Sequence, residues 1–195
     1  MAGKLLIVVT GTPGAGKSSF AKELIGALDG AKLIEINDIV EEYKLFSSID
    51  KMGSRIVKLK ELEAKLKDVI KNQRKNSDII LVGHLASEME LKPDIAIVVR
   101  VTLNELIKRL EARKYQKEKI KENIISESVD YCGMKAREQC KEAYEIETDD
   151  AERKEIIQYV VKRSEGKMPK PPEANEINRF KELLDLIADG NKYSL

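Results

Sequence analysis

A glycine-rich stretch near the start of the sequence has the residue types and the spacing that hold phosphate groups. It reads GTPGAGKS from Gly11 to Ser18 and fits the pattern GxxxxGK[ST]. Its glycines permit tight turns in which successive backbone N–H groups point at phosphate oxygens. Lys17 offers an ammonium group to the β- and γ-phosphates, and the Ser18 hydroxyl can ligate the Mg²⁺ that bridges them. The residues expected to bind ATP are Gly11, Pro13, Gly14, Ala15, Gly16, Lys17, Ser18 and Ser19.

This loop stands between a predicted strand and a predicted helix, which is the context that a phosphate-binding loop needs. Residues 5–9 form an unbroken apolar run, typical of a strand buried on both faces of a parallel sheet. Because strands and helices alternate, we expect a doubly wound α/β sheet with flanking helices, and the loop indicates a P-loop NTPase fold. Further strands are expected at 32–36, 79–82, 95–99 and 144–147, and helices at 18–28, 38–45, 52–74 and 104–112.

The C-terminal part is expected to be mostly helical. A long helix is predicted from Lys117 to about Ala143, and another at 150–163. A linker follows at 164–172, and an amphipathic helix at about 173–189 is predicted to stop at Gly190. A chain of 195 residues favours a single domain, 1–195.

The composition limits the kinds of partner that the protein can attract and indicates the cellular compartment in which it works. The 35 basic and 34 acidic side chains leave a net charge of +1, so no overall field attracts nucleic acid or an anionic membrane, and any direct RNA contact stays open as a local one. Cys132 and Cys140 lie eight residues apart in an expected helix, about 12 Å, which is too far for a disulfide. Free thiols and the lack of an apolar segment long enough for a membrane favour a cytoplasmic protein.

Several motifs besides the loop resemble one kinase family. They are Gly83-His84 after the third strand, Val98-Val-Arg100, the stretch RLEARKY from Arg109 to Tyr115, and KIKEN from Lys119 to Asn123. Together with GTPGAGKSS they resemble the archaeal and eukaryotic adenylate kinases of the sixth type over roughly residues 4–150. The resemblance implies a five-stranded parallel sheet of order 2-3-1-4-5, a monophosphate-binding segment at about 36–75 and a short lid at about 113–123. It also implies the reaction ATP + AMP to 2 ADP.

Three arginines are candidates for the charge neutralisation that phosphoryl transfer requires. Arg100 ends a predicted strand whose carboxyl edge faces the site, and we expect it to contact substrate. Arg109 and Arg113 are four apart and share a helix face. By resemblance, Arg109 flanks the ATP base and Arg113 grips the transferring phosphate. The alternative, that Arg109 and Arg113 pair with Glu105 and Glu111 on a solvated helix, stays open.

The acceptor side departs from the family pattern. Glu41 occupies the position where related enzymes often carry a basic residue for the acceptor phosphate, and only Lys44 could substitute for it. Asp38, in the same segment, is the other candidate for substrate binding. Val82 occupies the position of a carboxylate that orients water on Mg²⁺, and Asp38 could reach the metal through a water instead. His84 is the single histidine, with either a structural role or a role in orienting water near the γ-phosphate.

Three functions follow as expectations. The first is a nucleoside monophosphate kinase that uses ATP and Mg²⁺ on AMP or another monophosphate, with ATP hydrolysis as a side activity. The second is an ATP-dependent assembly factor for the small ribosomal subunit that binds a ribosomal protein, which rests on the resemblance alone. The third is a small-molecule kinase of similar architecture. A GTPase is excluded because Asn191-Lys192-Tyr193-Ser194, the nearest stretch to a guanine-reading Asn-Lys-x-Asp, lacks the aspartate.

Overall fold

Five parallel strands form the central sheet of the computed structural model, which describes residues 4–49, 55–147, 150–173, 177–191 and 193. The strands are β1 (Leu6–Thr10), β2 (Lys32–Glu35), β5 (Ile79–Val82), β6 (Ile95–Val99) and β7 (Ala143–Ile146). They lie in the order β2-β5-β1-β6-β7, all parallel, so the predicted order 2-3-1-4-5 is confirmed. β1 lies in the centre because Val9 pairs with Val82 on one side and with Ile97 on the other.

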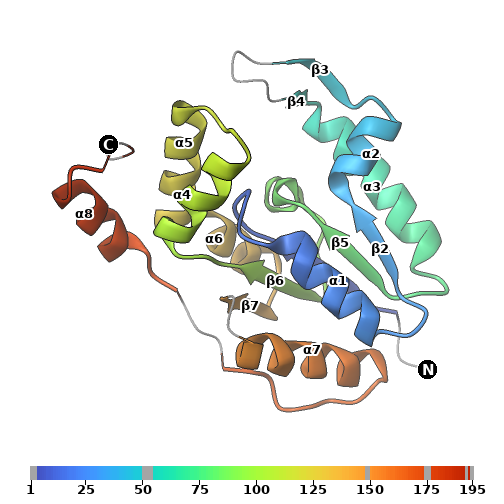
Figure 1. The fold of residues 1–195 in the computed structure, drawn as a ribbon. Helices are drawn as coiled ribbons and strands as arrows, with labels where there is room; N and C mark the ends of the chain where they lie inside the picture. Colours follow the sequence, from blue (N-terminus) through green and yellow to red (C-terminus); the bar gives the residue numbers. More distant parts are fainter. Residues whose placement is uncertain (1–3, 50–54, 148–149, 174–176, 192, 194–195) are drawn as a thin grey trace.

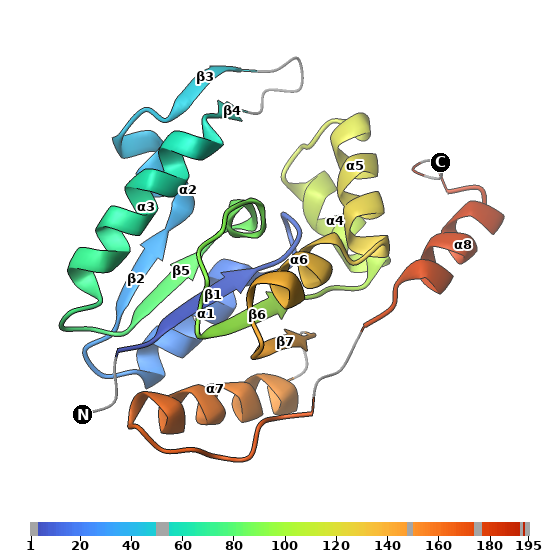
Figure 2. The same ribbon diagram turned by 180° about the vertical axis from the view of Figure 1, so that it is seen from behind.

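Helices cover both faces of this sheet (Figure 1). One apolar core joins the sheet to α1 (Lys17–Ala27), α4 (Leu103–Ala112), α5 (Lys117–Ser128), α7 (Asp150–Ser164) and α8 (Phe180–Ala188). A second core joins the opposite face to α2 (Ile36–Glu42), α3 (Leu59–Gln73) and the 3₁₀ helix η1 (His84–Glu88). Seen from behind, α6 (Tyr131–Gln139) covers the part of this face over β6 (Figure 2). Among the described residues no helix has the length and apolarity to cross a membrane.

The expected helix at 52–74 is wrong at its start. Arg55–Val57 is a strand, β4, which pairs antiparallel with β3 (Phe46–Ile49), and α3 begins only at Leu59. Residues 50–54 lie outside the described part. The apolar spacing that continued back to Ile56 was misleading because Ile56 pairs with Ser48 across the hairpin. The helical period itself is confirmed from Leu62 onward, since Leu62, Leu66 and Ile70 are buried.

The expected single helix from Lys117 to Ala143 is two helices, α5 and α6. The chain breaks at Asp130, whose φ of 53° is left-handed. The carboxylate of Asp130 bonds the guanidinium groups of Arg100 and Arg137, so tertiary ion pairs stabilise a conformation that helical periodicity does not reveal. Cys140 is the C-cap of α6, and both cysteines are free.

The last helix begins at Phe180, seven residues later than expected. Residues 174–176 lie outside the described part. Before the helix, the Ile177 N–H donates to Glu145 Oε2 at 3.0 Å and Arg179 pairs with Glu147, which ties this stretch to the end of β7. Gly190 ends the helix as predicted, with a φ of 62°.

Candidate active site

The phosphate loop joins the end of β1 to the start of α1 and needs glycine for its shape. Gly11 has a φ of 136°, and a Cβ there would lie 2.3 Å from the carbonyl oxygen of Val99. Gly16 is the left-handed N-cap of α1, with a φ of 110°. The loop therefore presents its N–H groups at the carboxyl edge of the sheet, where the positive end of α1 adds to them.

Lys17 lies over this loop and bonds its backbone. Its Nζ donates to the carbonyl oxygens of Gly11 at 2.8 Å and Thr12 at 3.0 Å. Burial lowers the pKa of Lys17 to about 8, and the positive charge of Arg113 acts in the same direction. Phosphate oxygens in place of the two carbonyls would raise that pKa again, since an anion favours the charged form.

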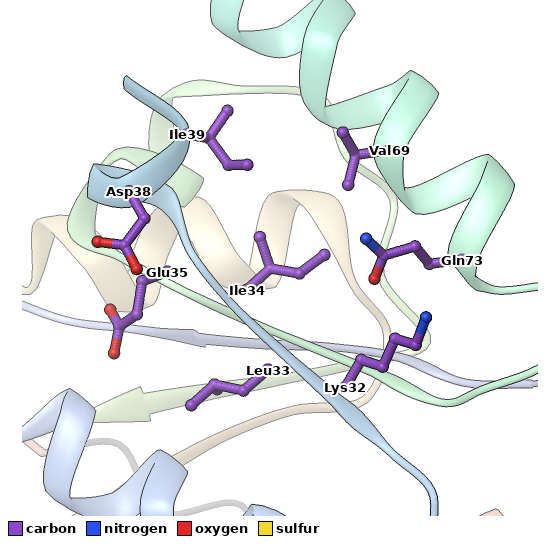
Figure 3. Close-up of a pocket in the computed structure, with 8 residues that line it drawn as sticks. All are labelled: Lys32, Leu33, Ile34, Glu35, Asp38, Ile39, Val69 and Gln73. Atoms are coloured by element: carbon purple, nitrogen blue, oxygen red, sulfur yellow. The ribbon is translucent and has the colours of Figure 1, made fainter. Parts of the chain in front are cut away.

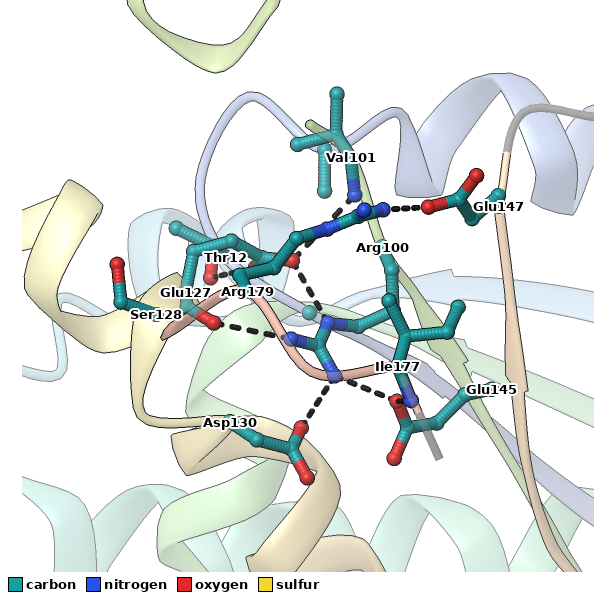
Figure 4. Close-up of polar contacts among 12 residues, drawn as sticks. Thr12, Arg100, Val101, Glu127, Ser128, Asp130, Glu145, Glu147, Ile177 and Arg179 are labelled. Atoms are coloured by element: carbon teal, nitrogen blue, oxygen red, sulfur yellow. Dashed lines mark hydrogen bonds and ion pairs between the residues drawn. The ribbon is translucent and has the colours of Figure 1, made fainter. Parts of the chain in front are cut away.

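A buried ionic network supports the loop from behind (Figure 4). Thr12 Oγ1 donates to Glu127 Oε2 at 2.6 Å, and Arg100 Nε donates to Glu127 Oε1 at 2.7 Å. Arg100 Nη1 also lies 2.5 Å from carboxylate oxygens of Asp130 and of Glu145. Burial alone would lower the pKa of Arg100, but the three carboxylates raise it above its ordinary value. The network thus joins the loop to the end of β6, to α5 and to β7.

The expectation that Arg100 contacts substrate is therefore corrected. Its side chain is 1% exposed, and its donors face Glu127 and two further carboxylates rather than an open site. Periodicity placed Arg100 correctly at a strand end, but it could not reveal that acids from two later segments surround the guanidinium. Thr12 and Glu127, which the sequence did not single out, are the residues that connect Arg100 with the loop.

Arg109 contacts the loop from α4, and Arg113 caps the end of the same helix. Arg109 Nη1 donates to the carbonyl oxygens of Gly14 and Ala15, at 3.2 Å each. Its Nε donates to Glu105 Oε1 at 2.8 Å, so the alternative of a helix ion pair is also realised for this residue. Arg113 is the exposed C-cap of α4, and its charge lowers the pKa of Lys17. Glu111, the partner that the same alternative gives to Arg113, accepts a hydrogen bond from the Tyr193 hydroxyl.

A cleft of about 990 Å³ opens beside the loop. This volume is within the range of small-molecule sites. One wall comes from α2, the hairpin and the start of α3, the floor from η1, and the other wall from the α4–α5 turn, α5 and the start of α6. Its described lining consists of Pro13, Asn37, Val40, Glu41, Ile49, Arg55, Val57, Leu59, His84, Leu85, Glu88, Lys114, Tyr115, Gln116, Lys119, Glu122, Asn123, Ser126, Tyr131 and Cys132.

His84 lines this cleft at the end of β5, where sequence reasoning placed it. Burial lowers the pKa of its imidazole to about 4, and the charges of Lys17 and Lys119 act in the same direction. The ring is therefore neutral near pH 7, with one nitrogen able to donate and the other able to accept a hydrogen bond.

Asp38 and Lys44 lie apart from the lining of this cleft. Asp38 is exposed and borders a separate hollow of about 360 Å³ between β2 and α3, next to Glu35 (Figure 3). Asn37 and Glu41, on the same helix, line the main cleft instead. Lys44 is exposed and has a left-handed φ of 52° just after α2.

The donors available for Mg²⁺ fit an ion held chiefly by its nucleotide. Ser18 and Ser19 are exposed in the first turn of α1. Within the described residues no group of three or more His, Cys, Asp or Glu side chains could enclose a metal ion. One hydroxyl beside a phosphate loop, with phosphates and water as the other ligands, matches the usual coordination of Mg²⁺ in such sites.

Comparisons with known proteins agree with this fold. Residues 7–130 match a family model described as "AAA domain". A Methanosarcina barkeri protein named "Putative adenylate kinase" is 37% identical over 158 residues, which are 81% of this chain and 85% of that protein. A protein of the same name from Archaeoglobus fulgidus is 31% identical over 187 residues, 95% of this chain and 97% of that protein.

A solved structure supports the fold. The shikimate kinase from Acinetobacter baumannii in complex with shikimate superposes with a TM-score of 0.53 at 15% identity, over 84% of this chain and 94% of that one.

Proposed function

The chain belongs to the AAA-domain family of P-loop proteins and to the same family as these archaeal relatives, and from this membership we propose that it is a nucleoside monophosphate kinase. It transfers the γ-phosphoryl group of ATP to AMP. An oxygen of the AMP phosphate attacks the γ-phosphorus, the bond to the β-phosphate oxygen breaks, and two ADP molecules leave. The names of the relatives support AMP as the acceptor.

The observation that carries this proposal is the position of the cleft. It begins at Pro13 of the phosphate loop and extends to a second wall formed by α2 and the β3–β4 hairpin. Transfer between two nucleotides requires an acceptor beside the γ-phosphate and in line with the bond that breaks. A loop for the donor and an adjoining cavity for a second molecule provide that arrangement.

The donor phosphates are assigned to the loop and to three cations. The N–H groups around Gly14 and Gly16 bind the phosphates, and Lys17 exchanges its carbonyl partners for β- and γ-oxygens. Arg109, already against the loop, flanks the donor nucleotide, and Arg113 neutralises the charge on the group in transfer. Mg²⁺, held through Ser18, neutralises charge on the β- and γ-phosphates when it is bound.

His84 is assigned to orientation rather than to proton transfer. Because the low pKa keeps its imidazole neutral, it holds an acceptor oxygen or a water by hydrogen bonds without changing charge near pH 7. AMP arrives already ionised, so its phosphate needs no general base in order to attack. Slow hydrolysis of ATP is expected when water occupies the acceptor position.

The test is ADP formation from ATP and Mg²⁺ with AMP, CMP, UMP, GMP or no acceptor. Turnover that requires a nucleoside monophosphate, fastest with AMP, supports the proposal. Lys17→Ala should abolish it, whereas Lys22→Ala, at an exposed position of α1, should not. Phosphate release that no monophosphate accelerates would contradict a monophosphate kinase and leave an ATPase. Phosphorylation of shikimate or another alcohol in place of AMP would point to a small-molecule kinase.

A further inference from the structure

An acceptor monophosphate brings about two negative charges into the cleft at neutral pH, since the second pKa of a phosphate monoester is near 6. Lys17 and Arg109 lie on the donor side, where both bond loop carbonyls. On the opposite wall, the described residues that line the cleft come from α2, the hairpin and the start of α3. Among these, Arg55 of β4 is the cation.

Arg55 is held in a defined place by two contacts. Its guanidinium forms an ion pair with Glu41 of α2, which lines the same cleft. Its Cζ lies 4.8 Å from the centre of the Phe46 ring on the partner strand β3. A cation–π contact of this kind holds the guanidinium against the ring without using its N–H donors. The hairpin thus presents a preorganised fork of donors to the cleft.

The ion pair is also easy to exchange. The side chains of Arg55 and Glu41 are 44% and 45% exposed, so water already solvates both partners. An exposed pair of this kind contributes little to stability. A guanidinium binds phosphate by two parallel charged hydrogen bonds. An arriving phosphate dianion can therefore compete with the carboxylate of Glu41 for the N–H donors of Arg55.

We propose that Arg55 binds the phosphate of the acceptor nucleotide and that Glu41 is a positioning residue that holds Arg55 at the cleft. This inference rests on the proposed function, because it concerns the acceptor of that reaction. Arg55 has a second effect at the same place. Without it, the carboxylate of Glu41 would face the acceptor phosphate uncompensated and would repel it.

The experiment measures binding of AMP and of adenosine by calorimetry, together with the KM for AMP and for ATP. For Arg55→Ala we expect affinity for AMP to fall about 10- to 100-fold, the range for one lost charged hydrogen-bonding group, with adenosine binding unchanged. The KM for AMP should rise correspondingly and the KM for ATP should stay the same. Arg55→Lys keeps the charge without the fork of donors, so its affinity for AMP should lie between those of the unchanged protein and of Arg55→Ala.

A double variant separates phosphate binding from a structural role. Arg55→Ala combined with Glu41→Ala should bind AMP more tightly than Arg55→Ala alone, because the uncompensated carboxylate is gone. The matched control is Arg153→Ala. Arg153 of α7 also pairs with a glutamate, Glu23, and lies 5.6 Å from the ring of Phe20, but it does not line the cleft. Its loss should leave AMP binding unchanged.

Two results would overturn the inference alone. One is AMP binding by Arg55→Ala equal to that of the unchanged protein, and the other is an equal loss of AMP and adenosine. In both cases AMP-dependent ADP formation by the unchanged protein still supports the proposed function. If the unchanged protein neither binds AMP nor uses it, both proposals fail together. Thermal unfolding of every variant checks that the substitutions leave the fold intact.

Discussion

Lys17 carries its charge in a half-buried position, next to two carbonyl oxygens. With a pKa of about 8 the side chain is mostly protonated at pH 7 and mostly neutral above pH 9 in the nucleotide-free protein. Bound polyphosphate raises the pKa, so above pH 8 binding must take up a proton. Affinity for ATP is then expected to fall by up to about tenfold per pH unit above the pKa of the free protein.

Calorimetry of ATP binding between about pH 7 and about pH 9.5 checks this, with buffers of different ionisation enthalpy to count the protons. Lys22→Ala should keep the same pH profile, because that exposed lysine lies outside the loop. A dissociation constant that stays level across this range would show that Lys17 keeps its proton without nucleotide.

Residues near one another in sequence were predictable, and residues paired across the fold were not. The spacing of Gly11, Gly16 and Lys17 defines a loop whose geometry depends on the next few residues. The bond between Thr12 and Glu127 joins positions 115 residues apart, and no local pattern marks it. Arg55 was missed for another reason. It lies in a segment that was read as helix, so nothing indicated that it faces Glu41.

Among the elements, α5 has a structural role through Glu127. Glu127→Ala would leave the guanidinium of Arg100 buried without its main partner and the hydroxyl of Thr12 without its acceptor. Loss of one partner from a buried ion pair costs about 3–5 kcal/mol. Unfolding by denaturant should show a loss of that size, and Glu127→Gln, which can still accept from Thr12, should lose less.

The control for this comparison is Glu63→Ala on α3. Glu63 pairs with Lys67 one turn later, with the lysine side chain 52% exposed. Such pairs contribute about 0.3–0.5 kcal/mol. Equal stabilities for Glu127→Ala and Glu63→Ala would mean that the buried network adds nothing to the fold.

Strands and helices with a continuous local pattern were predicted well, whereas their limits were decided by tertiary contacts. The central strands β1, β5 and β6 read as apolar runs because both of their faces are buried. The division between α5 and α6 depends on Asp130, which ion pairs hold in a left-handed conformation. The late start of α8 depends on Arg179 and Ile177, which bond acids near the end of β7.

For the molecule as a whole, α8 is part of the main core. Leu183, Leu186 and Tyr193 are buried in the same cluster as Leu106 of α4 and Ile124 of α5. Glu182 of α8 also accepts a hydrogen bond from the Leu103 N–H, at the start of α4, at 2.8 Å. The last helix thus supports the helix that carries Arg109 and Arg113, although a long connection separates it from α7 (Figure 1).

Two leucines on this helix test that role. Leu186 is 7% exposed, and Leu186→Ala should cost about 2–4 kcal/mol of unfolding free energy in a single transition. Leu184 is 50% exposed, so Leu184→Ala should change stability by less than about 0.5 kcal/mol. An early separate transition in the melting curve, or two equally mild variants, would indicate a helix that folds independently of the core.

The single imidazole of this chain lies in the cleft, between the phosphate loop and the wall that carries Arg55. In a nuclear magnetic resonance spectrum its ring protons give one set of signals that needs no assignment by mutagenesis. Because the pKa of His84 is about 4, the chemical shifts of those signals should not change when buffer pH varies around neutrality. Separate titrations with each nucleotide can therefore be followed at one native atom, without an added label.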